Sequence, residues 1–226
     1  MTIKPALLVV LATSLAVVPQ AIADDSLVMK TLLHNENELF TPPAKNAPLQ
    51  ALLAKKPALT FFEACGVGDT DEMSKQLKSD PKLATAWGPH GLSALHYAAY
   101  SGVPAAVQLL LDRGADINAR ARSKFKNTPL QIGLLVGQLA AAKLLLERGA
   151  DPLVRQAEGF TPLHQAALLG RRDLVDLLLG AGAEVNSRTD DGRTPLAEAL
   201  RTKHPEIAEY LRSKGGHGKE LTPEQE

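Results

Sequence analysis

Histidine and cysteine, the side chains that most often serve as metal ligands, nucleophiles and bases, are few in this chain. His96 and His164 recur at the same place in a repeated motif, and there we expect each imidazole to hydrogen-bond neighbouring backbone rather than bind a metal. The remaining histidines fall at no metal-ligand spacing: His34, His90, His204 and His217. The sequence also contains no G-x-S-x-G, H-E-x-x-H or P-loop pattern.

Clustered carboxylates are the other candidates for chemistry, and they occur as DTDE at 69–72 and TDD at 189–191. Both clusters lie in turn-forming sequence and are interpreted as solvated turns. The sequence therefore predicts no catalytic, metal-binding or cofactor-binding residue, and we expect that the protein is not an enzyme.

The balance of charge argues against two further classes of ligand. The 226 residues include 25 basic and 25 acidic side chains, so the net charge is zero. Such a chain has no general attraction to nucleic acid or to an anionic membrane. Its 45% of hydrophobic residues is enough to bury a substantial core.

The elements that must position these side chains recur at a fixed interval. The leucines that open each unit are 35, 33 and 33 residues apart, and so are the glycines that close each unit. The leucines are Leu95, Leu130, Leu163 and Leu196, and the glycines are Gly114, Gly149, Gly182 and Gly215. A period of this length is typical of repeat architectures, in which neighbouring units stack to bury a continuous core.

Each unit is predicted to contain two short helices. The first has sequences such as SALHYAAYSG and TPLHQAALLG, where Thr161 caps the helix and Pro162 occupies its first turn. Gly102, Gly137 and Gly170 are expected to end these helices. The second helix has sequences such as LAAAKLLLERG, with apolar residues at helical spacing, and an extended connector follows it.

These patterns resemble the ankyrin-repeat family. The motifs T-P-L-H-x-A-A-x-x-G and L-L-L-x-x-G-A-x-x-N are that family's signature and occur several times in register, although one unit has Gln131-Ile132-Gly133 where the family prefers His-x-Ala. The resemblance implies an all-α fold, an ankyrin-repeat solenoid of about five helix-turn-helix repeats joined by β-hairpin-like connectors. The arrangement is similar to that of exported bacterial ankyrin proteins.

The domain boundaries follow from the repeat register. We expect a signal peptide at 1–23, an N-terminal segment and linker at 24–58, an ankyrin-repeat domain at 59–215 and a disordered tail at 216–226. The repeats are placed at about 59–89, 90–124, 125–157, 158–190 and 191–215, and the first of them is degenerate. Cys65 takes the place of the small Ala99, and we expect it to be buried and inert.

The export signal is read from the N-terminus. A short basic start precedes an apolar run of about 14 residues, and Ala21-Ile22-Ala23 matches an A-x-A cleavage site. A spanning helix needs roughly 20 apolar residues, so cleavage after Ala23 is favoured over an uncleaved membrane anchor. The mature protein is therefore expected in the periplasm, with secretion as the alternative, as a monomer that is not inserted in the membrane.

The first candidate partner site is an apolar stripe on the concave face. The resemblance implies that partners contact the connector tips and the first helices, where two variable residues precede each helix-ending position. These pairs are Tyr100-Ser101, Leu135-Val136, Leu168-Leu169 and Arg201-Thr202. An exposed apolar patch of this kind marks an interface. The alternatives are that the N-terminal segment covers the stripe or that the helices turn it inward.

The second candidate is the connector RARSKFKN, which carries the two extra residues of the 35-residue interval. Its basic residues surround one aromatic ring: Arg120, Arg122, Lys124 and Lys126 around Phe125. Such a tip suits the acidic surface of a protein partner. Trp87 and Phe160 lie on neighbouring connectors and are expected to extend the contact. The alternative is a solvated loop.

The leading functional prediction is a non-catalytic scaffold for protein–protein interaction, with no role in nucleic-acid binding and no cofactor. The family resemblance implies two narrower possibilities: a link to oxidative-stress protection, or an antitoxin or immunity protein that neutralises a secreted effector. A periplasmic chaperone-like accessory protein, which would hold clients on the apolar stripe, is a further alternative.

Overall fold

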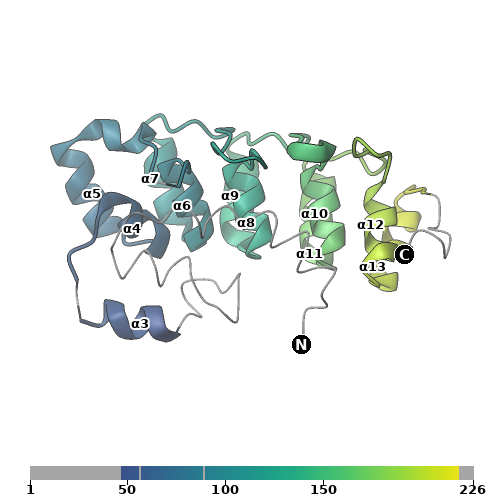
Figure 1. Ribbon diagram of the computed structural model, residues 1–226, viewed down its shortest axis with the longest axis horizontal. Helices are drawn as coiled ribbons and strands as arrows, with labels where there is room; N and C mark the ends of the chain where they lie inside the picture. Colours follow the sequence, from purple (N-terminus) through teal and green to yellow (C-terminus); the bar gives the residue numbers. More distant parts are fainter. Residues whose placement is uncertain (1–46, 56, 89, 219–226) are drawn as a thin grey trace. The chain divides into compact units, whose positions relative to one another are not determined.

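All regular secondary structure in the described part of the chain is helical (Figure 1). The computed structural model describes residues 47–55, 57–88 and 90–218, so the proposed signal peptide lies outside the described residues. Within these ranges the β structure is limited to an isolated antiparallel bridge between Trp87 and Ser93. No helix in them is long and apolar enough to span a bilayer. The predicted all-α class is confirmed.

The described helices fall into two compact units, residues 47–150 and 151–218. The first unit contains α3 (Ala47–Leu53), α4 (Phe61–Val67), α5 (Thr70–Ser79), the 3-10 helix η2 (Pro81–Thr85), α6 (Ala94–Ser101), α7 (Pro104–Leu111), α8 (Pro129–Leu135) and α9 (Leu139–Glu147). The second contains the 3-10 turn η3 (Ala157–Gly159), α10 (Pro162–Leu168), α11 (Arg172–Gly180), α12 (Pro195–Arg201) and α13 (Pro205–Ser213).

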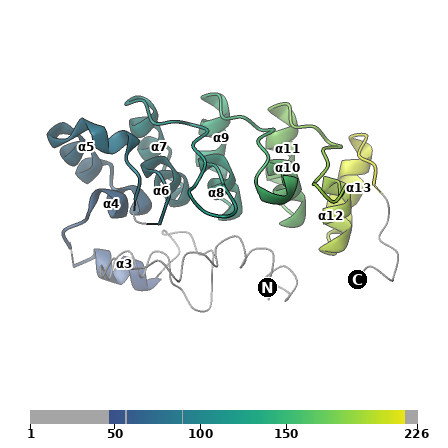
Figure 2. The same ribbon diagram turned by 45° about the horizontal axis from the view of Figure 1, so that its top comes forward.

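Within each unit the helices form two layers. In the first unit, α4, α6 and α8 lie side by side in one layer, and α5, α7 and α9 form the other (Figures 1 and 2). In the second unit, α10 packs against both α11 and α12, and α12 packs against α13. Small side chains allow this close packing, and Ala98, Ala99, Ala166 and Ala167 are fully buried. The interior is therefore built between neighbouring helix pairs, as the repeat period predicts.

Capping boxes fix the start of most first helices. In α4 the Thr60 hydroxyl accepts from the Glu63 backbone N–H, and the Glu63 carboxylate accepts in return from the Thr60 N–H at 2.7 Å. The same reciprocal arrangement starts α6, α8 and α10. In α10, proline in the first turn fixes φ at a helical value, and its missing N–H costs nothing because that N–H would have no partner within the helix. The predicted cap at Thr161 is confirmed.

Left-handed residues end the same helices. Gly102, Gly137 and Gly170 have φ values of 76°, 73° and 67°, as predicted. Lys203 holds the equivalent place after α12 with φ at 62°. A non-glycine residue in this region is strained, because its Cβ approaches the following carbonyl. The last hairpin is therefore strained where the other repeats are relaxed.

The connectors show a similar substitution. Two residues before the N-cap, three connectors have glycine with positive φ: Gly91, Gly159 and Gly192. The connector that leads into α8 has Lys126 at that place, with φ at 55°. The basic connector is therefore also strained at its tip.

The segment after α13 folds back onto the last repeat. The Gly216 N–H donates to the Leu211 carbonyl at 2.8 Å, and the His217 N–H donates to Asn186 Oδ1 at 2.9 Å. Residues 216–218 were predicted to belong to the tail. In the structure they lie beside the start of α12, since a Cβ added to Gly218 would be only 2.6 Å from Thr194 Oγ1.

Candidate protein-interaction surface

The repeated histidines are structural. His96 Nδ1 accepts from the Ser93 hydroxyl at 2.7 Å and from the Ser93 N–H at 3.1 Å. On the other side of the ring, Nε2 donates to the Asn127 carbonyl at 2.9 Å. His164 repeats this pattern with the Thr161 hydroxyl at 2.8 Å and the Arg193 carbonyl at 3.0 Å. The predicted backbone hydrogen bonds are confirmed, and they join each repeat to the next connector within its unit.

Burial sets the protonation of these rings. Both imidazoles are fully buried, and this burial lowers the pKa of His96 and of His164 to about 4. Both rings are therefore neutral at pH 7, with the proton on Nε2. Among the described residues, no group of three or more His, Cys, Asp or Glu side chains is placed to hold a metal ion.

Cys65 is buried in α4, as predicted from the repeat register. Loss of solvent raises the pKa of its thiol, and the backbone hydrogen bond that opposes this effect is weaker. A neutral buried thiol is a poor nucleophile.

The predicted apolar stripe is not exposed, and the prediction of its exposure was wrong. Leu135 and Val136 are 6% and 7% exposed, Leu168 is 1% exposed, and Leu169 is half-buried. The cause is helix packing: α8 packs against α6 and α9, α10 packs against α11 and α12, and all seven residues of each of these two helices are buried. Tyr100 is half-buried, and burial raises its pKa to about 12. These side chains therefore do not form an exposed apolar patch.

Phe160 is also buried, contrary to its predicted place on an exposed tip. Its ring centroid lies 5.3 Å from that of His164, and the Arg193 guanidinium lies 5.8 Å from the ring. Phe160 therefore covers the bridging histidine.

The basic connector is exposed, and we name it the basic finger: Arg120, Arg122, Lys124, Phe125 and Lys126. Its four cationic side chains are exposed, and its aromatic ring is half-buried with the Lys124 ammonium 4.8 Å from the ring centroid. The Asn127 carbonyl accepts from the Ala121 N–H at 2.8 Å, which closes the base of the finger. No acidic residue occurs in the sequence between Asp116 and Glu147, so the local charge is strongly positive.

Trp87 supports the base of the basic finger. The Arg122 guanidinium stacks 4.2 Å from the centre of the indole ring, and the Arg122 N–H donates to the Gly91 carbonyl at 2.8 Å. The half-buried indole and the finger therefore form one continuous surface within residues 47–150. Of the predicted site residues, the structure brings Arg122 against Trp87 and Lys124 against Phe125.

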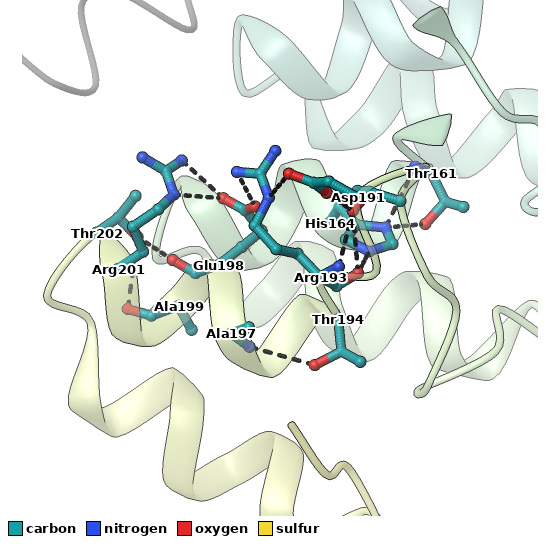
Figure 3. Close-up of polar contacts among 11 residues, drawn as sticks. Thr161, His164, Asp191, Arg193, Thr194, Ala197, Glu198, Ala199, Arg201 and Thr202 are labelled. Atoms are coloured by element: carbon teal, nitrogen blue, oxygen red, sulfur yellow. Dashed lines mark hydrogen bonds and ion pairs between the residues drawn. The ribbon is translucent and has the colours of Figure 1, made fainter. Parts of the chain in front are cut away.

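An ion-pair cluster in α12 and the connector before it is not among the site residues predicted from the sequence (Figure 3). Glu198 is fully buried, with Oε1 2.7 Å from Arg193 Nη1 and Oε2 2.7 Å from Arg201 Nη2. Arg193 Nε also lies 2.7 Å from Asp191 Oδ2. The signal that could have shown part of this cluster is the i,i+3 spacing of Glu198 and Arg201 on one helix.

Stacked two-helix repeats with buried small residues and exposed connectors define the chain as a helical repeat protein. Residues 61–156 and 152–222 match the family model described as "Ankyrin repeats (3 copies)", which is more than half of the chain. The chain belongs to the ankyrin-repeat family, a family of protein-interaction modules that are generally not catalytic.

Two curated relatives share part of the repeat region. The chain is 38% identical over 80 residues to the E3 ubiquitin-protein ligase XB3 of Oryza sativa subsp. japonica, covering 35% of this chain and 17% of the relative. It is 39% identical over 72 residues to a transient receptor potential cation channel subfamily A member 1 homolog of Caenorhabditis elegans, covering 32% and 6%. In both, the match spans less than a fifth of the relative's length.

Proposed function

We propose that this protein is a non-catalytic scaffold that binds an acidic surface of a protein partner through the basic finger and Trp87. The observation that carries the proposal is the strained, exposed tip, where Lys126 replaces the glycine of the other connectors. Strain of this kind persists where function requires it.

The chemistry of the finger fits an acidic protein surface. Four exposed cations steer association through long-range attraction, which weakens as salt rises. Phe125 and Trp87 supply apolar and aromatic area for contact once the partner has arrived, and such residues are enriched in interfaces. The Arg122–Trp87 stack holds one cation in place before binding, which lowers the entropy lost in the complex.

The partner is expected in the periplasm, because residues 1–23 have the pattern of a cleaved signal peptide. Exported ankyrin proteins imply two roles, protection against oxidative stress and neutralisation of a toxin, and one stoichiometric protein partner would favour a scaffold or an antitoxin. The chaperone alternative depended on an exposed apolar stripe, and burial of Leu135 and Leu168 removes that support.

Photo-crosslinking in the exporting cell tests the proposal. A photo-reactive amino acid replaces Phe125 in one strain and Leu139, an exposed residue of α9, in a control strain. We expect one abundant crosslinked protein from position 125 and none of the same mass from position 139. Crosslinks from 125 to many unrelated proteins, or to none, would contradict a single-partner scaffold.

Charge reversal then tests the electrostatic part of the proposal. Lys124→Glu with Lys126→Glu should slow association with the crosslinked partner about tenfold at low salt, with the difference fading in high salt. The matched control is Lys75→Glu with Lys143→Glu, which makes the same charge change on α5 and α9. Equal effects of both pairs would mean that overall charge, rather than the finger, guides binding.

A further inference from the structure

The last repeat has charged residues at three positions in and directly before α12 where the three preceding repeats have neutral ones. Counted from the N-cap, the residue four places on is Tyr97, Ile132 or Gln165 in the earlier repeats and Glu198 in the last. The residue seven places on is Tyr100, Leu135 or Leu168, and it becomes Arg201. The residue directly before the cap is Leu92, Asn127 or Phe160, and it becomes Arg193. Three positions that are neutral in the preceding repeats are therefore charged in the last one.

Two features of the last repeat disfavour the folded state. Glu198 is fully buried, and a buried ion pair is commonly less stabilising than an apolar residue of the same volume. Lys203 is held at φ 62° in the place of the helix-ending glycine, only two residues after Arg201. Since the earlier repeats show that neutral residues and glycine fold well at these places, packing alone does not account for the charged set.

One terminal nitrogen of each guanidinium takes no part in these ion pairs. Arg201 uses Nε and Nη2 to hold Glu198 Oε2, at 3.0 and 2.7 Å, and Arg193 uses Nη1 for Glu198 and Nε for Asp191. Arg201 Nη1 and Arg193 Nη2 form no ion pair or hydrogen bond with any residue that the structure describes. Figure 3 shows the two guanidinium groups on the same side of α12, with the Glu198 carboxylate between them.

We propose that Arg193 and Arg201, oriented by Glu198, bind a carboxylate of an acidic segment in a protein partner. A planar guanidinium presents paired donors that match a carboxylate. The carboxylates of Asp191, Glu198 and Glu158 offset much of the positive charge of the arginines, which disfavours a phosphate dianion more than a monoanionic carboxylate. The site lies in residues 151–218 and is a contact additional to the basic finger.

A nuclear magnetic resonance titration of the ¹⁵N-labelled full chain tests the site directly. The probe is a capped tetraglutamate peptide, with a capped tetraglutamine peptide and inorganic phosphate as controls. We expect tetraglutamate to shift the Arg201 and Arg193 Nε–H signals in a saturable way, and tetraglutamine to leave them unchanged. Phosphate that shifts both signals at the same or lower concentration would overturn the assignment to carboxylate.

Variants separate the site from general charge attraction. Arg201→Gln should weaken tetraglutamate binding at least tenfold, whereas Arg172→Gln, which removes another ion-paired arginine of the same unit, should change it less than twofold. Arg201→Lys keeps the charge and should still weaken binding several-fold, because the fork is lost. Circular dichroism confirms that each variant is folded.

Glu198→Gln gives opposite results under the two explanations. It removes a negative charge, so general attraction predicts tighter tetraglutamate binding, whereas loss of the orienting carboxylate predicts weaker binding. Tighter binding, or equal losses in the Arg201→Gln and Arg172→Gln variants, would overturn the proposal. Since the titration needs no partner and no part of the basic finger, its outcome is independent of the crosslinking result.

Discussion

At the scale of the residue, the repeated histidines combine two demands that only a neutral ring can meet. Nδ1 of His96 accepts from both the hydroxyl and the N–H of Ser93, and Nε2 donates to the Asn127 carbonyl. A protonated ring has a hydrogen on Nδ1 and cannot accept there. Protonation would therefore break the cap of the helix and introduce a buried charge.

The first prediction is a loss of stability in acid. The pKa of His96 and of His164 is about 4 in the folded chain and near 6.5 when unfolded. The stability contribution of each neutral ring is complete above pH 7 and decreases as the pH falls from 6.5 to 4. At pH 4 the free energy of unfolding should be lower by roughly 3 kcal/mol for each histidine. Urea unfolding at pH 7.5, 5.5 and 4.5 measures it.

The control for this prediction is already present in the chain. Gln131 occupies the same position in α8, and its Oε1 accepts from the Thr128 N–H at 3.0 Å. His96→Gln with His164→Gln should keep the caps and flatten the pH dependence between 6.5 and 4. An unchanged slope in this double variant would show that other groups cause the acid sensitivity.

The second residue-scale prediction concerns Cys65. Because it is buried and the pKa of its thiol is raised, native protein should react with a thiol reagent far more slowly than protein in urea. Ellman's reagent followed by absorbance gives both rates. Similar rates in the two states, or a disulfide-linked dimer without reductant, would refute the burial.

At the scale of the element, the hairpins between paired helices depend on close approach. In the second unit, a Cβ added to Gly170 would lie 2.4 Å from His204 Nδ1 in the next hairpin. A Cβ added to Gly182 would have no described neighbour within 4 Å, apart from adjacent residues. Both glycines have positive φ, at 67° and 90°. The two positions therefore separate backbone strain from steric contact.

We predict unequal costs for alanine at these two positions. Gly182→Ala should lower the free energy of unfolding by about 1 kcal/mol, since only the left-handed backbone opposes it. Gly170→Ala should lower it by roughly 1–3 kcal/mol more, because the new methyl group meets the His204 ring. Denaturant titration of both variants measures the difference. Equal losses would mean that the His204 ring moves aside freely.

Local signals explain which parts of these elements the sequence predicts. The cap at Thr161, the left-handed Gly170 and the hydrogen bonds of His164 depend on neighbours within a few residues or on the repeat register, and they are predicted correctly. The exposure of Leu135 and Phe160 was predicted wrongly, because it depends on packing between helices and a local sequence pattern does not predict that packing. The cluster around Glu198 was missed because Arg193 lies in the preceding connector, and only the fold places it beside the helix.

At the scale of the whole molecule, equal numbers of acidic and basic residues conceal local differences in charge. The basic finger has four exposed cations in a stretch of 30 residues without a carboxylate between Asp116 and Glu147. The α12 cluster instead pairs its arginines with buried or nearby carboxylates. Net charge therefore does not describe the surfaces that a partner meets.

The whole-molecule prediction concerns export. If residues 1–23 are a cleaved signal peptide, the periplasmic protein should begin at Asp24. Mass spectrometry of the intact protein from the periplasmic fraction tests this. A mass that retains Met1, recovered with membranes, would show that the apolar segment remains as an anchor.

The bridging histidine also determines the order in which the second unit comes apart. His164 on α10 donates to the Arg193 carbonyl, so α10 opens only if its bond to the next connector breaks. Ala197 occupies the same place on α12 and has no polar side chain with which to bind a further repeat. The α12–α13 hairpin therefore lacks a forward hydrogen bond of the kind that His164 makes from α10. Fraying should begin at α13, whose amide protons should exchange with deuterated solvent before those of α10.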